Sequence, residues 1–344
     1  MFIGKDWSDP DVVVADHRVV IAPRILDGLF RSVPDVTDKI LDCSPIRRYE
    51  VCNTCCAEAE SEIPMRTISS AAEMTALAKE AKRAGKRVGF VPTMGALHPG
   101  HLSLVNTARA QTDVLVTSIF VNPAQFGPKE DFGKYPRTLE KDSALLAAGG
   151  VDYLFAPSVE EMYPKGASTS VEVEGISDRL DGQSRPGHFR GVTTVVSKLF
   201  NIVLPDLAFF GQKDAAQVAI IRKMVRDLQF DVHIVVCPTV RESDGLAMSS
   251  RNVYLSPEQR KQALVLYRSL MRVQLLADRG EKDAARLIAA AKQVIAEEPA
   301  ARLDYFEIVN NDTLEPVPDI SGGALAAVAA YVGQTRLIDN IVLL

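Results

Sequence analysis

Apolar and polar residues alternate in blocks along residues 65–344, and these blocks predict strands and helices in turn. The motif Ser70-Ala-Ala-Glu73 has the spacing of a helix capping box, and Gly85 is a fitting stop for the Ala- and Lys-rich segment that follows it. Residues 113–120 form a continuous apolar run, which is typical of a strand covered on both faces. The same reasoning predicts further strands at 87–91, 152–156, 207–210 and 232–236, and further helices at 102–110, 138–148, 192–203 and 214–227.

The order of these elements predicts the fold class. Strands that alternate with helices indicate an α/β protein with a doubly wound, Rossmann-like parallel sheet, which we assign to residues 65–250. After about residue 255 the pattern changes, because two helical stretches precede three apolar strand candidates. We therefore expect a smaller C-terminal α+β domain over residues 251–344, with helices at 257–279 and 282–298 and strands at 303–309, 325–332 and 337–342.

Residues 1–64 differ from the rest of the chain in charge and in cysteine content. They hold seven Lys and Arg against twelve Asp and Glu, whereas residues 65–344 hold 32 of each. No sustained helix or strand period appears in them. We expect an atypical, loosely ordered N-terminal extension, with Met65 as a candidate start codon. The alternative is zinc binding by Cys52-x-x-Cys55 with Cys43 and Cys56 nearby.

Composition excludes several classes of protein. The 344 residues are 47% apolar and 24% charged, as in an ordinary soluble globular protein. No apolar run approaches the ~18–20 residues that span a bilayer, and the first residues lack the basic-then-apolar layout of a secretory signal. The neutral charge of residues 65–344 and their single cysteine, Cys237, indicate a cytoplasmic enzyme that binds neither membrane nor nucleic acid.

The strongest candidate for chemistry is the turn at residues 92–101, between a predicted strand and a predicted helix. In open parallel sheets, ligands bind beyond the carboxyl ends of the strands. Gly95 and Gly100 allow the backbone to approach a ligand closely, and the helix start offers N–H groups that suit a phosphate. His98 and His101, two of only five histidines, belong to this turn. An incidental loop and a zinc site are the alternatives, although no further zinc ligands are evident.

Two further segments follow predicted strands. Asn122 and Gln125 are neutral donors and acceptors suited to orienting a polar substrate. Lys213 lies beside a glycine at a strand end, as a phosphate-binding lysine does, and Gln217 follows about one turn into the next helix. A structural turn explains either segment equally well when it is taken alone.

A fourth segment, Ser249-Ser-Arg251, offers two hydroxyls and a guanidinium beyond the last predicted strand of the parallel sheet. A Gly- and Pro-flanked basic loop at 184–190 is a candidate mobile lid. If the sheet is doubly wound, the segments meet in one crevice. Cations gathered around a helix N-terminus, in a body without net charge, predict a triphosphate site rather than a nucleic-acid surface.

Five strings of residues resemble the motifs of one enzyme family: Val91-Pro-Thr-Met-Gly-Ala-Leu-His-Pro-Gly-His101, Ser118-Ile-Phe-Val-Asn-Pro-Ala-Gln-Phe126, Arg185-Pro-Gly-His-Phe-Arg-Gly191, Phe210-Gly-Gln-Lys-Asp214 and Asp244-Gly-Leu-Ala-Met-Ser-Ser-Arg-Asn252. They are similar to those of pantothenate synthetases (pantoate–β-alanine ligases), within the nucleotidyltransferase and class I synthetase superfamily. The resemblance extends from about residue 65 to 344 and includes Arg336-Leu-Ile-Asp-Asn340. Gln212 is a small departure, because Glu is often expected there.

The resemblance implies an AMP-forming ligase that makes a coenzyme A precursor. Pantoate would react with ATP to give pantoyl adenylate and pyrophosphate, and β-alanine would then displace AMP to give pantothenate. Mg²⁺ is expected with the triphosphate, no metal site made by the protein alone is expected, and a homodimer is the usual assembly. A nucleotidyltransferase that stops at adenylyl transfer, a tRNA-charging synthetase and a non-catalytic nucleotide-binding protein are the alternatives.

Site residues are carried over from the family by motif. Catalytic roles fall to His101, the expected proton donor, and to His98, Lys213 and Arg251. Gln125 would bind pantoate and later β-alanine, and Gln217 would bind pantoate. The resemblance assigns ATP binding to Met94, Gly95, Ala96, Leu97, His98, Pro99, Gly100, His101, Gly211, Gln212, Lys213, Asp214, Val240, Met248, Ser249, Ser250 and Arg251.

Overall fold

The computed structural model describes residues 12–15, 18–21, 64–128 and 130–344, and the chain divides into two units, Met1–Ser61 and Glu62–Leu344. In the first unit, β1 (Val12–Ala15) and β2 (Arg18–Ile21) pair as antiparallel strands. The search for a strand period over residues 1–64 therefore missed these two strands, because strands of four residues are too short to show one. The cysteines of the zinc alternative lie outside the described residues.

The second unit contains a six-stranded parallel sheet with the order β3-β6-β5-β4-β7-β8. From β4 the chain proceeds outward through β5 and β6, and it then returns to the other side of β4 to form β7 and β8. The strand order therefore reverses between β4 and β7, which is where such sheets bind ligands. The strands are β3 (Arg66–Ile68), β4 (Val88–Thr93), β5 (Val114–Ile119), β6 (Tyr153–Phe155), β7 (Leu207–Gly211) and β8 (His233–Cys237).

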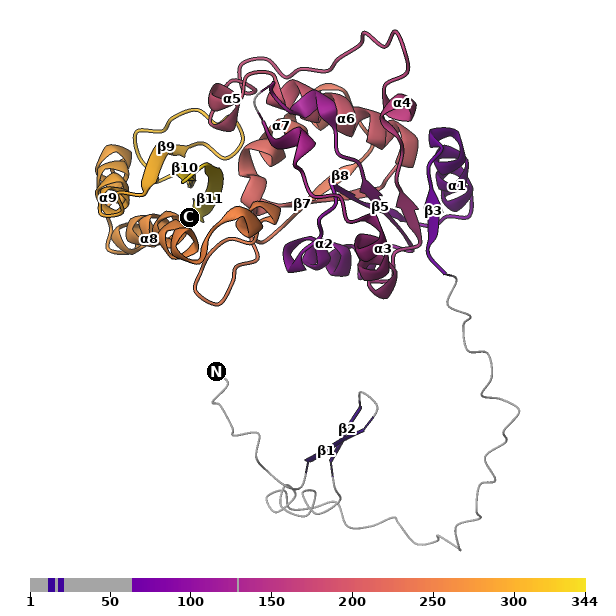
Figure 1. Ribbon diagram of the computed structural model, residues 1–344, viewed down its shortest axis with the longest axis horizontal. Coiled ribbons are helices and arrows are strands. Elements are labelled where there is room, and N and C mark those ends of the chain that lie inside the picture. Colours follow the sequence, from indigo (N-terminus) through magenta and orange to yellow (C-terminus); the bar gives the residue numbers. More distant parts are fainter. Residues whose placement is uncertain (1–11, 16–17, 22–63, 129) are drawn as a thin grey trace, which may run out of the picture. The chain divides into compact units, whose positions relative to one another are not determined.

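Helices cover both faces of this sheet, as predicted for a doubly wound fold. Helices α1, α6 and α7 pack on one face, and α2 and α3 pack on the other (Figure 1). The helices are α1 (Ala71–Arg83), α2 (Pro99–Arg109), α3 (Leu139–Ala148), α4 (Val159–Met162), α5 (Asp181–Ser184), α6 (His188–Val203) and α7 (Ala215–Asp227), with 3₁₀ turns η2 (Pro123–Gln125), η3 (Asp131–Gly133), η4 (Gln212–Asp214) and η5 (Ser250–Tyr254).

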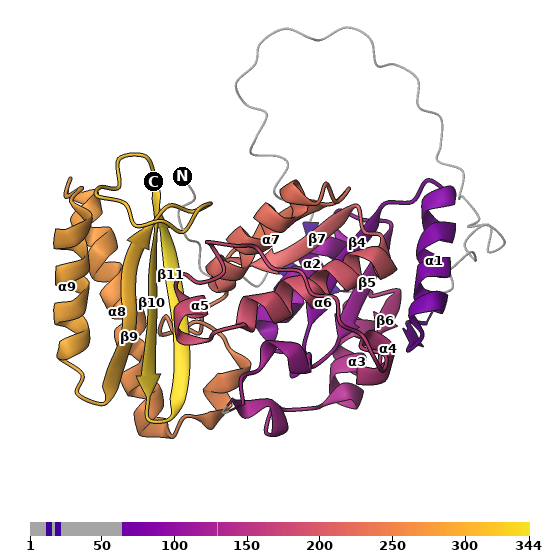
Figure 2. The same cartoon turned by 90° about the horizontal axis from the view of Figure 1, so that it is seen from above.

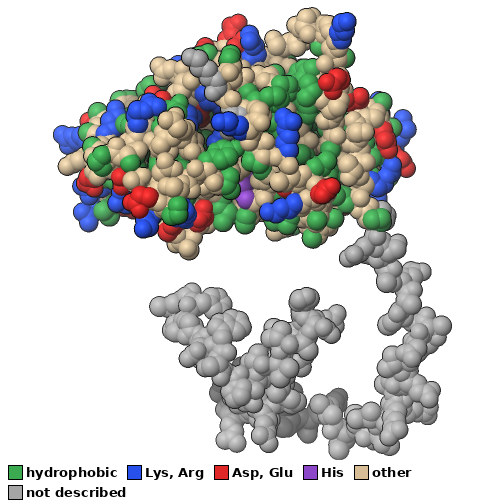
Figure 3. Space-filling view, in the orientation of Figure 1, with side chains coloured by type: hydrophobic (Ala, Val, Ile, Leu, Met, Phe, Trp, Pro, Cys, Tyr) green, Lys and Arg blue, Asp and Glu red, His purple; other side chains and the backbone are tan. Residues whose placement is uncertain are grey.

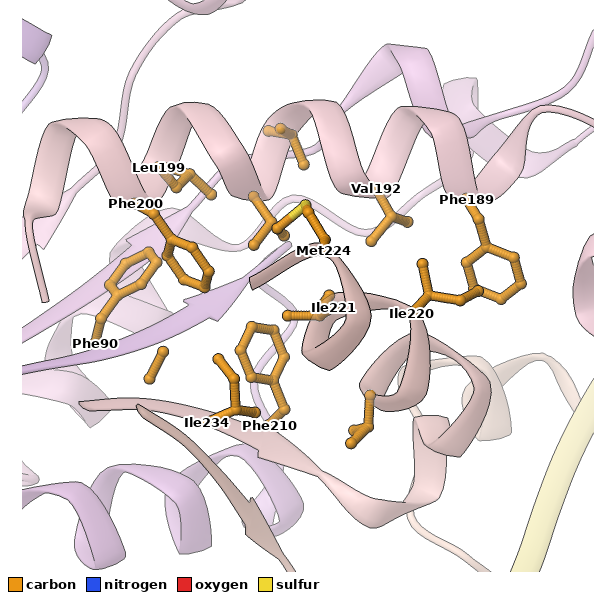
Figure 4. Close-up of a cluster of buried hydrophobic side chains, with 14 of the residues drawn as sticks. Phe90, Phe189, Val192, Leu199, Phe200, Phe210, Ile220, Ile221, Met224 and Ile234 are labelled. Atoms are coloured by element: carbon orange, nitrogen blue, oxygen red, sulfur yellow. The ribbon is translucent and has the colours of Figure 1, made fainter. Parts of the chain in front are cut away.

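The largest core cluster lies between the sheet and helices α6 and α7 (Figure 4). Phe90 of β4 meets Phe200 of α6 edge to face, with ring centroids 6.5 Å apart, and Ile221 of α7 is completely buried. Aromatic pairs of this geometry add to the stabilisation that burial of apolar area provides. The packing fixes α6 and α7 against the sheet, and both helices begin at the edge where the predicted site residues lie.

The last part of the chain forms a separate antiparallel sheet with helices on one face (Figure 2). Its own core of buried residues lies between sheet and helices. The prediction of a smaller C-terminal α+β part is confirmed, while the boundary at residue 250 stays a prediction. The elements are α8 (Pro257–Asp278), α9 (Ala284–Ala296), β9 (Ala301–Val309), β10 (Ala324–Val332) and β11 (Thr335–Leu343).

Several predicted bounds need correction. Helix α2 begins at Pro99 rather than 102, because Pro at the first helical position is favourable and His98 caps the helix. Helix α6 begins at His188 rather than 192, directly after Gly187, which has a positive φ of 79°. The three-residue strand β3 was not predicted. Among the described residues, no helix is long and apolar enough to cross a membrane.

Gly191 shows how closely α6 approaches the site edge. Its carbonyl oxygen accepts a hydrogen bond from Asn122 Nδ2 at 3.1 Å, and a Cβ atom there would overlap the carbonyl oxygen of Ala124. Gly191→Ala should therefore lower the free energy of unfolding by about 1–3 kcal/mol, as overpacking does. Gly322→Ala is the control, because a methyl group added there would meet nothing within 4 Å. Urea denaturation of both variants measures the difference; equal stability would contradict this packing argument.

Candidate active site

Four predicted site segments lie at one edge of the six-stranded sheet. Because all six strands are parallel, their carboxyl ends share that edge. The segments that follow β4 and β7 flank the point where the strand order reverses. In order along the chain, the segments are residues 94–101 after β4, 122–125 after β5, 211–214 at the end of β7 and 240–251 after β8.

The turn after β4 is held by a carboxylate that the sequence analysis missed. Gly95 and Ala96 both adopt positive φ angles, 81° and 53°. Asp142 of α3, which is 1% exposed, accepts hydrogen bonds from the backbone N–H of Ala96 at 2.8 Å and of Leu97 at 3.0 Å. Its Oδ2 also accepts from the Thr138 hydroxyl at 3.1 Å. Charge-assisted bonds of this kind offset the cost of the left-handed turn and determine where α2 begins.

His98 and His101 lie at the start of α2 and cap it reciprocally. His98 Nδ1 accepts from the Gly100 N–H at 3.1 Å, and His101 Nδ1 accepts from the His98 N–H at 3.4 Å. The ring centroids are 4.1 Å apart. Since each Nδ1 accepts, a neutral ring carries its hydrogen on Nε2. The helix start therefore presents two imidazole N–H donors. Histidine atoms, purple in Figure 3, reach the surface near the middle of that view.

Burial and neighbouring cations keep both rings uncharged. Burial lowers the pKa of His98 to about 4, with the Lys213 ammonium as the second cause. Burial also lowers the pKa of His101 to about 3, with His98 as the second cause. The Asp214 carboxylate acts in the opposite direction on both. These interactions bring the start of α2 and the residues after β7 into one electrostatic environment.

Gln125 is held by a buried polar network. Asn122 is 1% exposed, and its Nδ2 donates to Gln125 Oε1 at 3.1 Å, while its Oδ1 accepts from the Tyr163 hydroxyl at 2.9 Å. Gln125 Nε2 lies 2.9 Å from Met94 Sδ, which joins this network to the turn after β4. Asn122 thus positions Gln125, a role different from the direct contact with substrate that the sequence suggested for it.

The basic loop predicted as a lid packs on the backbone of Gln125. Arg185 makes a bidentate ion pair with Glu130, at 2.7 and 2.6 Å. His188 Nδ1 donates to the Gln125 carbonyl oxygen at 2.8 Å, and its Nε2 accepts from Arg185 at 2.9 Å. Burial, followed by Arg185, lowers the pKa of His188 to about 4. Movement of this loop stays a prediction.

A cavity of about 1440 Å³ opens beside the loop that carries Arg185 and His188. It exceeds the range of about 300–1,000 Å³ that is usual for one drug-sized ligand, so it has room for a nucleotide and a second molecule. Arg185 and His188 contribute to its wall. Five of the predicted site residues also line it: Lys213, Asp214, Gln217, Ser249 and Arg251.

The remaining predicted residues, among them His98, His101 and Gln125, are not part of the lining of this cavity. Met248 donates its N–H to the Val240 carbonyl oxygen at 3.0 Å, which closes the turn before Ser249. Ser250 Oγ lies 3.4 Å from the Tyr135 hydroxyl, and the Arg251 guanidinium lies 6.0 Å from the centre of the Tyr135 ring. Gly211 and Gln212 continue from β7 directly into the Lys213 turn.

The described residues contain no group of three or more His, Cys, Asp or Glu side chains that would hold a metal ion. Asp142 is a poor ligand, since both of its oxygens already accept hydrogen bonds. Asp214 is different, because it lines the cavity and its side chain is 47% exposed. A hard cation that is carried mainly by phosphate oxygens fits this setting, since one carboxylate is then enough.

Comparison with known proteins identifies the family. The family model described as pantoate-beta-alanine ligase matches residues 66–342. The chain belongs to the pantoate–β-alanine ligase family. The pantothenate synthetase of Koribacter versatilis is 64% identical over 279 residues, which are 81% of this chain and 96% of that protein. The pantothenate synthetase of Acetivibrio thermocellus is 58% identical over 278 residues, 81% of this chain and 99% of that protein.

Solved structures of the pantoate–β-alanine ligase family share the fold. Pantothenate synthetase from Thermus thermophilus is 51% identical, with a TM-score of 0.76, and the match covers 80% of this chain and 99% of that one. The ligase from Francisella tularensis, in complex with beta-gamma ATP and β-alanine, is 35% identical, with a TM-score of 0.67 and coverage of 80% and 97%. The resemblance inferred from the motifs and the predicted fold class are both confirmed.

The buried histidines should make stability depend on pH. In the unfolded chain a histidine titrates near 6.5, whereas His98 and His101 titrate near 4 and 3 in the folded protein. The unfolded chain therefore binds more protons below pH 6.5, so their contribution to stability is complete above that pH and falls as the pH drops toward 4. Imidazole NMR titration should give midpoints well below 6.5 for both rings; midpoints near 6.5 would contradict their burial as neutral groups.

Asp142→Asn tests the turn after β4. The amide keeps one acceptor oxygen but places an N–H group opposite a backbone N–H group, which repels it. The turn should therefore lose its shape and ATP binding should weaken. The free energy of unfolding should fall by about 1–3 kcal/mol. Asp206→Asn is the matched control, because Asp206 accepts from the Val88 N–H at 2.7 Å at the opposite end of β4. Calorimetric titration with ATP should distinguish them, since only the first variant should lose affinity. Equal ATP affinity in both variants would refute the assigned role.

Proposed function

We propose that this chain joins pantoate to β-alanine at the expense of ATP, through a pantoyl-adenylate intermediate. A pantoate carboxylate oxygen attacks the α-phosphorus of ATP and pyrophosphate leaves. The β-alanine amine then attacks the acyl carbon, AMP leaves and the amine loses a proton. Family membership supports the overall reaction. The observation that carries the proposal is the His98 and His101 pair at the start of α2, in electrostatic contact with Lys213.

The first step requires negative charge on the triphosphate to be stabilised as pyrophosphate departs. The α2 N-terminus carries a partial positive charge, and the two imidazole N–H groups are fixed in place before ligand binding. We assign phosphate binding to these groups together with Lys213 and Arg251, and the rest of the nucleotide to the backbone of residues 94–97 and 211–214, with Val240 and 248–250. A bound triphosphate would raise the pKa of His101, which would allow it to donate a proton.

Gln125 and Gln217 are proposed to orient pantoate, with Gln125 also orienting β-alanine. Holding two reactants in line can contribute about 7–11 kcal/mol to lowering the barrier, so adenylation needs no covalent nucleophile from the enzyme. The network from Asn122 limits the conformations of Gln125, which suits that orienting role. The Francisella tularensis ligase with beta-gamma ATP and β-alanine supports the choice of ligands.

Several further features belong to this proposal. Mg²⁺ is proposed to enter with ATP and to neutralise charge on its phosphates, with Asp214 as the carboxylate that fits it. A closing cover protects an acyl adenylate from water, and we assign that role to residues 185–190.

We also propose a cytoplasmic homodimer. Its chain would have residues 1–64 as an extension, residues 65–250 as the ATP- and pantoate-binding domain and residues 251–344 as the C-terminal domain.

An assay of the purified chain with ATP, pantoate and β-alanine tests the function. We expect AMP, pyrophosphate and pantothenate, with full turnover only when both carbon substrates are present. His101→Ala should lower pyrophosphate release by orders of magnitude, because a fixed donor to the transition state is lost. The control is His233→Ala, since His233 is exposed at the opposite end of β8. Adenylyl transfer without pantothenate would favour a nucleotidyltransferase, and normal activity of His101→Ala would remove its catalytic role.

A further inference from the structure

Strand β11 contacts residues 211–214 of the site, which carry Lys213 and are called the lysine turn below. Asn340 is 4% exposed, and its Nδ2 donates to the carbonyl oxygens of Gln212 at 3.0 Å and Lys213 at 2.9 Å. Its Oδ1 accepts from Gln212 Nε2 at 3.1 Å. All three polar positions of this amide are therefore used on the turn that carries Lys213, and that turn follows β7 of the six-stranded sheet.

The neighbouring residue on β11 holds a second site segment. Asp339 is 3% exposed and makes a bidentate ion pair with Arg241, at 2.6 and 2.9 Å. Arg241 also donates to the Gly245 carbonyl oxygen at 3.1 Å and stacks on Tyr267. Residues 241–247 form a short antiparallel bridge, and the chain continues from it into Ser249. Asp339 therefore anchors the hairpin that leads into Ser249, Ser250 and Arg251.

The lysine turn has little other support from side chains. Neither η4 nor the start of α7 is capped by a side-chain hydrogen bond, and nothing lies within 4 Å of a Cβ placed on Gly211. Asn340 thus supplies fixed partners to this turn from outside it, whereas the ion pair of Lys213 with Asp214, at 3.6 Å, joins adjacent residues of the turn itself. An isosteric carboxylate at residue 340 would face two carbonyl oxygens and repel them.

We propose that Asn340 and Asp339 are positioning residues for the nucleotide: Asn340 fixes the turn of Lys213, and Asp339 fixes the hairpin before Ser249. The C-terminal sheet is thereby part of the ATP site although neither side chain acts on the reacting atoms. This inference rests on the proposed ATP-dependent function for the identity of the ligand.

The test compares Asn340→Asp and Asn340→Ala with Asn310→Asp. Asn310 lies at the end of β9 in the same part of the chain, and its Oδ1 accepts from two backbone N–H groups, which a carboxylate also does. Titration calorimetry should give an ATP dissociation constant raised about tenfold in Asn340→Ala, and more in Asn340→Asp, with no change in Asn310→Asp. The KM for ATP should rise more than the KM for β-alanine.

A second measurement separates positioning from a general loss of structure. The Lys213 ammonium is one cause of the low pKa of His98. If Asn340→Ala displaces the lysine turn, the His98 titration measured by NMR should move upward from about 4, while the melting temperature shows that the protein remains folded. A variant with unchanged ATP affinity and an unchanged His98 titration would overturn the proposal.

The two proposals can fail independently. Wild-type protein that binds ATP but yields no pantothenate would refute the ligase function, while the ATP affinities and the His98 titration would still decide the role of Asn340. Wild-type protein that makes pantothenate, together with Asn340 variants that bind ATP normally, would refute only the positioning role. If Asn340→Asp does not fold, Asn340→Ala carries the same comparison without adding a charge.

Discussion

The bonds from the Asp142 carboxylate to the N–H groups of Ala96 and Leu97 determine the geometry of the site, because they fix the turn from which α2 begins. A left-handed Ala96 is unfavourable in an isolated chain, and the buried Asp142 carboxylate, which accepts from two backbone N–H groups, offsets that cost. Once the turn is fixed, the helix start and both imidazoles follow, since His98 and His101 cap the helix that carries them.

The second constraint is electrostatic. Lys213 and Arg251 line one cavity, and Lys213 lies 3.6 Å from the Asp214 carboxylate, while Glu130 pairs with Arg185 and Asp339 pairs with Arg241. These ion pairs confine the positive charge to a small region, which suits the compact anion proposed here, a triphosphate, better than an extended polyanion. Burial keeps the imidazoles uncharged without ligand, so no additional positive charge has to be accommodated there before an anion binds.

Most of the fold could be predicted from the sequence because its elements have strong local signals. The apolar run at 113–120 and the capping-box spacing of Ser70 and Glu73 led to β5 and α1 nearly at their observed bounds. The candidate residues were found because they follow strands, and parallel strands end at one edge. Asp142 and Asn340 could not be found in this way. Each acts on backbone groups more than 40 residues away in sequence, and although Asn340 is part of a motif that resembles the family, nothing in the sequence indicates which backbone groups it contacts.

The C-terminal sheet looks independent in the sequence, because contacts between distant segments leave no local pattern. In the structure, two of its polar side chains support segments of the proposed site. Most of its buried residues form a core of their own, although Leu325 and Ala327 of β10 belong to the core cluster of the parallel sheet. Hydrophobic pattern alone therefore describes it as a separate α+β part. Its last strand nevertheless directs two buried polar side chains outward, to the lysine turn and to the hairpin before Ser249. Buried polar groups are costly unless they are paired, so the pairing between the two sheets is specific. Stability of the C-terminal part and geometry of the proposed phosphate-binding groups are therefore expected to be coupled, through these hydrogen bonds and through the apolar contacts of β10.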